Sequence, residues 1–190
     1  MQKRRIAIFA SGEGTNAQCI MDHFRNSAVG EVAWVVSSKS SAPVLERAKK
    51  AGIESRVLDR VHFYETDTII KELKERKIDL IVLAGFLWMV PEYLIKAFPN
   101  AIINIHPALL PKFGGKGMYG MKVHEAVIAS KEKESGISIH YVNEHYDEGK
   151  IISQFKCSVA ENDTPELLAK KIHQLEHMHF ANVIETIFKK

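Results

Sequence analysis

Short apolar runs alternate with stretches of helical periodicity along the first half of the chain. The runs Ile6–Ala10, Val32–Val36 and Asp79–Ala84 are almost continuously apolar, which is typical of strands buried on both faces of a parallel sheet. Residues 42–51 and 66–76 place apolar side chains at helical spacing. Strands that alternate with helices predict an α/β, Rossmann-like fold with a mainly parallel sheet flanked by helices.

The pattern changes toward the C-terminus. Ile137–Val142 alternates along its length, and Lys150–Ser158 follows as a second strand candidate with no helix between them. Two such strands in succession predict an antiparallel pair on the mainly parallel sheet. Thr164 and Pro165 have the residue types of a helix N-cap and first helical position, and we expect this helix to run to Phe188.

Composition is that of an ordinary soluble globular protein. The 190 residues are 46% hydrophobic and 26% charged, a balance that fits one domain over residues 1–190. The net charge of +3 is too small to indicate a nucleic-acid partner, and no apolar run is long enough to cross a membrane. Cys19 and Cys157 form no C-x-x-C pattern, so we expect a reducing, cytoplasmic location. For the oligomeric state, a monomer and a homodimer are both compatible with the sequence.

A glycine-rich turn, Ser11–Asn16, follows the first strand and opens a helix. Glycines let the backbone approach a ligand closely, and a helix N-terminus presents free N–H groups to an anion. The turn lacks the third glycine of a dinucleotide fingerprint and the Gly-Lys-Ser/Thr of a P-loop, so a single phosphate monoester is the favoured ligand. The alternative is a tight turn whose glycines only permit close packing.

Two other loops lie where a ligand is expected. Gly85–Val90 is apolar and aromatic and follows a strand, at the edge where open α/β sheets bind ligands. It either lines a pocket for a flat ligand or is tucked into the core. Residues 114–120 contain four glycines, which predicts a mobile loop beside the site that could act as a lid.

The stretch Ala101–Pro111 combines an apolar strand with two polar side chains at its end. Asn104 and His106 are two residues apart, so they share one face of a strand. Pro107 ends that strand because it has no N–H. An amide that holds an oxyanion beside an imidazole that moves a proton is suited to acyl transfer. The alternative is a strand end with two satisfied polar residues.

Such a pair needs a group that tunes the imidazole. A carboxylate within about 4–6 Å raises the pKa of a histidine above its reference value of about 6.5. Asp147, in the turn after the Ile137–Val142 strand, is the candidate if that turn folds over the end of the strand that carries His106. Otherwise Asp147 only stabilises its own turn, as aspartates often do.

One short motif suggests zinc. His173–His177 matches the H-x-x-E-H pattern of inverted zinc proteases. No third ligand is identifiable, and the remaining pattern is that of a phosphate-binding α/β sheet. We therefore predict no metal, and Glu176 within the motif remains a candidate substrate contact.

Taken in chain order, these motifs resemble those of the phosphoribosylglycinamide formyltransferases, folate-dependent enzymes of purine synthesis among the formyltetrahydrofolate-dependent transferases and hydrolases. The matching segments span nearly the whole chain, and the Asn-x-His-Pro run with a downstream aspartate is the most specific of them. They are Ser11–Asn16, Leu83–Phe86, Asn104–Pro111, His140, Asp147–Gly149 and Glu176–His177.

The resemblance implies a reaction and its residues. The amine of glycinamide ribonucleotide would attack the formyl carbon of 10-formyltetrahydrofolate, the co-substrate. Asn104 and protonated His106 would stabilise the oxyanion, with His106 as proton donor. Asp147 would raise the pKa of His106 and help to pass protons through water. The implied binding residues are Gly14, Thr15 and Asn16 for the phosphate, Leu87, Trp88, Met89 and Val90 with Asn104 for the folate, and Glu176 for the glycinamide amine.

The chain departs from the family pattern in its outer folate contacts. Some members place an arginine near Thr66, and the sequence offers no counterpart there. Asp147–Lys150 stands where others read Asp-Gly-Gly-Pro, and residues 114–120 differ from a shorter loop. Relatives that act on methionyl-tRNA or hydrolyse formyltetrahydrofolate carry an added domain, for which 190 residues leave no room. The alternative functions are a formyltetrahydrofolate deformylase-like hydrolase and an inactive phosphosugar-binding protein.

Overall fold

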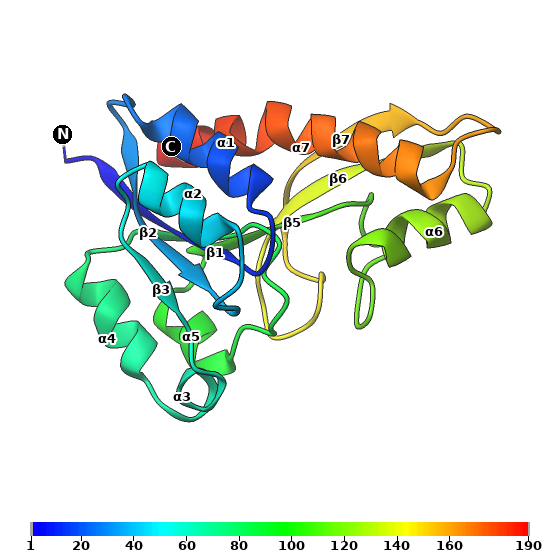
Figure 1. The fold of residues 1–190 in the computed structure, drawn as a ribbon. Coiled ribbons are helices and arrows are strands. Elements are labelled where there is room, and N and C mark those ends of the chain that lie inside the picture. The colour runs from blue at the N-terminus through cyan, green and yellow to red at the C-terminus, as the bar shows by residue number, and fades with distance from the viewer. Residues whose placement is uncertain (1, 190) are drawn as a thin grey trace. The chain divides into compact units, whose positions relative to one another are not determined.

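The computed structural model describes residues 2–189 (Figure 1). The chain divides into two compact units. The first unit holds the described residues up to Ile103 together with those from Ala181 onward, and the second holds Asn104–Phe180. Within the described chain, none of the helices combines the length and the apolar character needed to cross a bilayer.

The first unit contains four parallel strands with helices on both sides (Figure 1). The strands are β1 (Arg4–Ala10), β2 (Gly30–Ser37), β3 (Ser55–Val57) and β4 (Leu80–Leu83), and the helices are α1 (Thr15–Phe24), α2 (Val44–Lys50), α3 (Arg60–Glu65), α4 (Thr68–Glu75) and α5 (Glu92–Ala97). β1 pairs with β2 and β4, and β2 pairs with β3, all in parallel. The resulting order 3-2-1-4 is that of a nucleotide-binding α/β half, which confirms the predicted architecture here.

Burial explains why these strands read as continuous apolar runs. All of β4 is buried, as are the last five residues of β1, because helices cover both faces of a parallel sheet. The covering helices are amphipathic in turn. α4 buries Ile69 and Leu73 at helical spacing and leaves Lys71, Lys74 and Glu75 exposed.

The sequence pattern did not indicate α3. This short helix buries Phe63 but leaves Val61 and Tyr64 exposed, so no apolar periodicity marks it. The Asp59 side chain accepts a hydrogen bond from the N–H of His62. This is an N-cap contact, and it is the local signal from which the helix could have been predicted.

The second unit contains the antiparallel pair. β5 (Ile102–His106) leads into it and is followed by α6 (Met121–Ala129), β6 (Glu134–Tyr141), β7 (Ile151–Ser158) and α7 (Pro165–Phe188), whose last turns belong to the first unit. β6 and β7 pair antiparallel, as predicted. Hydrogen bonds order all the strands as β3-β2-β1-β4-β5-β6-β7. The N–H of Leu167 donates to the Thr164 hydroxyl, which confirms Thr164 as N-cap of α7.

The turn between β6 and β7 depends on a glycine. A Cβ at Gly149 would overlap the carbonyl oxygen of Tyr141, so the chain passes this close to β6 only without a side chain. Asp147, two residues earlier, has a φ of +57°, in the left-handed region that aspartate tolerates better than most residues. This backbone directs the Asp147 side chain into the second unit.

Candidate active site

Four polar side chains from three segments of the second unit meet in one cluster. Asn104 and His106 lie at the end of β5, His140 lies near the end of β6, and Asp147 comes from the following turn. The Asp147 carboxylate lies 3.4 Å from His106 Nδ1 and 3.6 Å from His140 Nε2. The turn therefore does fold over the end of β5, as the proposed pairing of Asp147 with His106 requires.

His106 lies between two oxygen acceptors. Its Nε2 is 2.7 Å from the carbonyl oxygen of Phe113, and since a carbonyl only accepts, this nitrogen carries a hydrogen. Its Nδ1 faces the Asp147 carboxylate. An imidazolium donates to both oxygens, whereas a neutral ring turns a lone pair toward the carboxylate. The hydrogen-bond geometry therefore favours the protonated ring.

Burial opposes this preference. His106 is 3% exposed, and the loss of water around the ring lowers its pKa, as does the nearby His140. The Asp147 charge and the Phe113 carbonyl raise the pKa. Burial is the largest of these effects, so the pKa of His106 lies below its ordinary value. Asp147 acts in the predicted direction, but the pKa of His106 is not raised overall.

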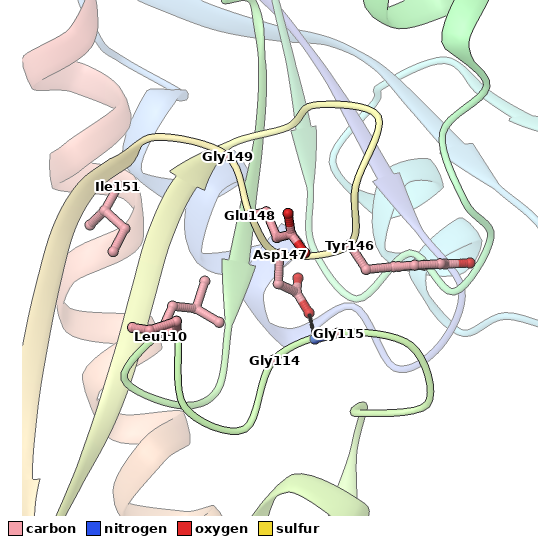
Figure 2. Close-up of a pocket in the computed structure, with 9 residues that line it drawn as sticks. Leu110, Gly114, Gly115, Tyr146, Asp147, Glu148, Gly149 and Ile151 are labelled. Atoms are coloured by element: carbon pink, nitrogen blue, oxygen red, sulfur yellow. Dashed lines mark hydrogen bonds between the residues drawn. The ribbon is translucent and has the colours of Figure 1, made fainter.

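The same contacts keep Asp147 ionised. Burial alone would raise the pKa of its carboxyl group, but its contact with the His140 ring, the charge of His106 and the N–H of Gly115 together lower it. The Gly115 N–H donates to Asp147 Oδ2 at 3.0 Å (Figure 2). A carboxylate with a lowered pKa remains charged at neutral pH.

His140 holds the Asn104 amide. Its Nδ1 is 2.9 Å from the carbonyl oxygen of Tyr141, so Nδ1 carries the hydrogen in the neutral ring and Nε2 accepts. Asn104 Nδ2 lies 3.2 Å from that Nε2. One amide hydrogen of Asn104 is thus committed to His140, while the second is available to another acceptor. Sequence reasoning matched His140 to the family but gave it no role.

A pocket of about 370 Å³ opens beside Asp147. Figure 2 shows Asp147 and Glu148 on one side of the pocket and the Leu110 and Ile151 side chains on another. The pocket is lined by Leu110, Pro111, Gly114, Gly115, Tyr146, Asp147, Glu148, Gly149 and Ile151. It combines apolar walls with a few polar groups, as small-molecule sites do.

In the first unit, the glycine-rich turn leads from β1 into α1 as predicted. Gly14 has a φ of +69°, and a Cβ there would lie 2.5 Å from Val44 Cγ2, so both backbone and space require glycine. Thr15 and Asn16 form the first turn of α1. Arg47 Nε donates to the Glu13 carbonyl at 2.7 Å, which fixes the turn against α2.

Ser11, which sequence reasoning left without a role, joins this turn to the loop after β4. Its N–H donates to the Gly85 carbonyl at 3.0 Å, and its hydroxyl accepts from the N–H of Leu87 at 3.0 Å. The carboxyl ends of β1 and β4 are adjacent because these parallel strands pair. The two predicted binding loops are therefore tied together.

The loop after β4 divides its side chains between solvent and interior. Leu87 and Met89 are 53% and 39% exposed, whereas Val90 is buried. The Trp88 ring packs near Phe63, and the Arg60 guanidinium lies 5.8 Å from its centre. Val90 therefore belongs to the core, as the second alternative predicts. The exposed Leu87 and Met89 do not, and for them the pocket-lining role stays a prediction.

Glu176 lies buried on α7 in the second unit. The neighbouring His173 and His177 are exposed, with ring centres 6.4 Å apart. Across residues 2–189, no group of three or more His, Cys, Asp or Glu side chains is arranged to hold a metal ion.

Comparisons with known proteins match nearly the whole chain. A family model described as formyl transferase matches residues 4–184. The chloroplastic phosphoribosylglycinamide formyltransferase of Arabidopsis thaliana is 40% identical over 98% of this chain, which spans 66% of that relative's length. The phosphoribosylglycinamide formyltransferase of Bacillus subtilis is 34% identical, over 97% of this chain and 94% of its own length.

A solved structure agrees with the sequence comparisons. The phosphoribosylglycinamide formyltransferase of Bacillus halodurans superposes with a TM-score of 0.88 at 37% identity, covering 98% of this chain and 96% of its own. The family match over residues 4–184 and the near full-length bacterial relative lead to one conclusion. The chain belongs to the formyl transferase family.

Proposed function

We propose that this chain transfers the formyl group of 10-formyltetrahydrofolate to the amine of glycinamide ribonucleotide, a step of purine biosynthesis. The observation that carries the proposal is the cluster in which Asn104, His106 and Asp147 converge, with His106 between two oxygens. Support comes also from relatives named phosphoribosylglycinamide formyltransferase that match nearly all of the chain.

The first step forms a carbon–nitrogen bond. The amine of the ribonucleotide attacks the formyl carbon, and the carbonyl oxygen becomes an oxyanion. The free N–H of Asn104, whose other N–H is directed at His140, donates to this oxygen. Protonated His106 donates to it as well, by turning its Nε2–H from the Phe113 carbonyl to the oxyanion. Oxyanion donors of this kind are each worth about 3–4 kcal/mol of barrier, which is larger than most single contacts in a site.

The second step breaks the bond between the formyl carbon and N10 of the folate. His106 gives its proton to N10 as the leaving amine, and the attacking amine loses a proton through water to Asp147. The products are formylglycinamide ribonucleotide and tetrahydrofolate, so atoms and charge balance. Asp147, now carrying the proton taken from the attacking amine, passes it to His106 3.4 Å away, so both groups return to their starting protonation states.

The binding residues belong to this proposal. Gly14, Thr15 and Asn16 take the phosphate through backbone groups at the start of α1. Leu87 and Met89 contact the pterin with their exposed side chains, and Trp88 and Val90 contribute backbone atoms. Asn104 also touches the folate, and Glu176 holds the glycinamide amine. We further propose that both units form one formyltransferase domain, that the enzyme works in the cytoplasm, and that it is a monomer or homodimer.

A folate-product assay tests this function. Tetrahydrofolate should be released from 10-formyltetrahydrofolate only when glycinamide ribonucleotide is present, with one formylated ribonucleotide formed per folate released. Release without the ribonucleotide would instead identify a deformylase-like hydrolase. Binding of the ribonucleotide without any release would identify an inactive phosphosugar-binding protein.

The proposed phosphate site predicts that the chain binds a phosphorylated ligand more tightly than its dephosphorylated form, which a binding measurement can test without turnover. In calorimetry, glycinamide ribonucleotide should bind at least about tenfold more tightly than its dephosphorylated form, because a helix N-terminus and charge-assisted N–H bonds hold the phosphate. Gly14→Ala should remove most of this difference, since the added Cβ meets Val44. Gly52→Ala, which adds a Cβ in open space at the same φ of +69°, is the matched control. Equal affinities for the two ligands would rule out a phosphate site in this turn.

A further inference from the structure

Residues 113–115 contact both members of the acid–base pair from one short turn. The Phe113 carbonyl accepts from His106 Nε2 at 2.7 Å, and the Gly115 N–H donates to Asp147 Oδ2 at 3.0 Å. His106 Nδ1 faces Asp147 on its other side. The turn thus closes a ring of contacts in which each member of the pair touches the backbone and its partner.

The residue between these two contacts has no room for a side chain. A Cβ at Gly114 would lie 2.5 Å from Leu110 Cδ2 and 3.2 Å from Asp147 Cβ. Its φ lies outside the left-handed region, so the backbone conformation does not require glycine. Space alone requires it, and one of the two obstructing atoms belongs to Asp147. Figure 2 shows the Asp147 carboxylate directed at this turn.

The base of the turn is held by a buried hydroxyl on β6 and by the amide of an exposed glutamine on β7. The Ser138 hydroxyl, which is fully buried, donates to the Ala108 carbonyl at 2.7 Å and accepts from the Leu110 N–H at 2.9 Å. Gln154 Nε2 donates to this hydroxyl at 2.8 Å and lies 3.0 Å from the Leu110 carbonyl. Both backbone groups of Leu110 are therefore held, and the Leu110 side chain in turn borders Gly114.

We propose that the Phe113–Gly115 turn positions the His106–Asp147 pair, and that Ser138 and Gln154 act as positioning residues by holding the base of that turn at Leu110. Residues 113–115 are then a fixed part of the site, unlike the mobile lid that the glycine content of 114–120 predicts. The expected effect of the turn on turnover rests on the proposed formyl transfer. The positioning of His106 and Asp147 does not, because it can be measured in the free protein.

Two variants test the proposal, one within the turn and one at the groups that hold its base. Gly114→Ala pushes against Asp147 directly, and Gln154→Met removes hydrogen bonds beneath the turn without entering the pocket. Lys116→Ala, an exposed substitution in the same loop, is the control. The first readout is the titration of the His106 ring followed by NMR in the free protein. The titratable groups coupled to His106 are Asp147, His140 and His124, so their signals are followed as well.

Both variants should lower the pKa of His106, because the Asp147 charge and the Phe113 carbonyl are the two influences that raise it. The second readout is turnover, where kcat should fall about 10- to 100-fold in Gly114→Ala, the magnitude expected when a catalytic pair is misplaced, and by less in Gln154→Met. KM for the ribonucleotide should change less than kcat. If Gly114→Ala does not fold, the His106 titration in Gln154→Met is the test of the proposal.

An unchanged His106 titration in the folded variants overturns the proposal, whatever happens to kcat, since a merely structural role would lower activity without moving that pKa. A shift of the same size in Lys116→Ala would overturn it too. If the wild-type chain transfers no formyl group, the proposed function fails while the titration still reports on the turn. The two failures are thus distinguishable.

Discussion

Replacing His106 with alanine should lower kcat at least about 100-fold, the usual contribution of a general acid–base group. The variant loses an oxyanion donor and the proton for N10 at once, so the loss should exceed that of either effect alone. KM for the ribonucleotide should change little, because the ring acts on the reacting carbonyl. Steady-state kinetics at saturating folate, with unfolding curves to confirm the fold, measure this.

His145→Ala is the matched control for this substitution. His145 is an exposed histidine in the turn that carries Asp147, and its side chain has no part in the proposed chemistry. Its kcat should stay within about twofold of the wild type, as expected for an exposed position outside the site. A kcat for His106→Ala in the same range as this control would remove His106 from the mechanism.

Replacing Asp147 with asparagine should also lower kcat at least about 100-fold, and it should change the pH dependence in a defined direction. The pKa of His106 already lies below its ordinary value because burial outweighs the Asp147 charge. Removing that charge lowers the pKa further. Activity that needs protonated His106 is present below this pKa and is lost as pH rises through it. The falling limb of kcat against pH should therefore move to lower pH in the variant.

The adjacent carboxylate provides the control. Glu148 lines the same pocket as Asp147 (Figure 2), but it is exposed and has no role in the proposed reaction. Glu148→Gln should keep both kcat and the position of the falling limb. A limb that stays in place in Asp147→Asn, or moves to higher pH, would show that Asp147 does not tune His106.

Much of the fold was predictable because burial leaves a direct pattern in the sequence. The strands β1, β2 and β4 and the helix α4 show it as continuous or helically spaced apolar residues. The antiparallel β6–β7 pair was predictable because no helix separates the two strands. α3 leaves no apolar pattern, since it packs through a single buried residue, Phe63, and only its N-cap aspartate marks it.

The candidate site was predictable only in part, for a physical reason. Asn104 and His106 share a strand face, so spacing alone placed them together. Asp147 reaches them through tertiary structure, by a left-handed φ and a glycine at 149 that lets the chain pass β6. No local pattern encodes that approach, so the sequence offered Asp147 only as a conditional candidate, and the family resemblance implied the same pairing. The sign of the pKa shift at His106 was beyond sequence reasoning, because it depends on how completely the ring is buried.

The contiguity of the reactive cluster has an evolutionary consequence. Asn104, His106, His140 and Asp147 all come from one uninterrupted stretch of chain inside a single unit. The turns proposed to take the phosphate and the pterin are encoded in the other unit. Mutations that alter how the phosphate of the acceptor is recognised can accumulate there without changing the residues of the reactive cluster. A gene segment of this kind can be inherited intact by enzymes that deliver the same one-carbon group to different acceptors.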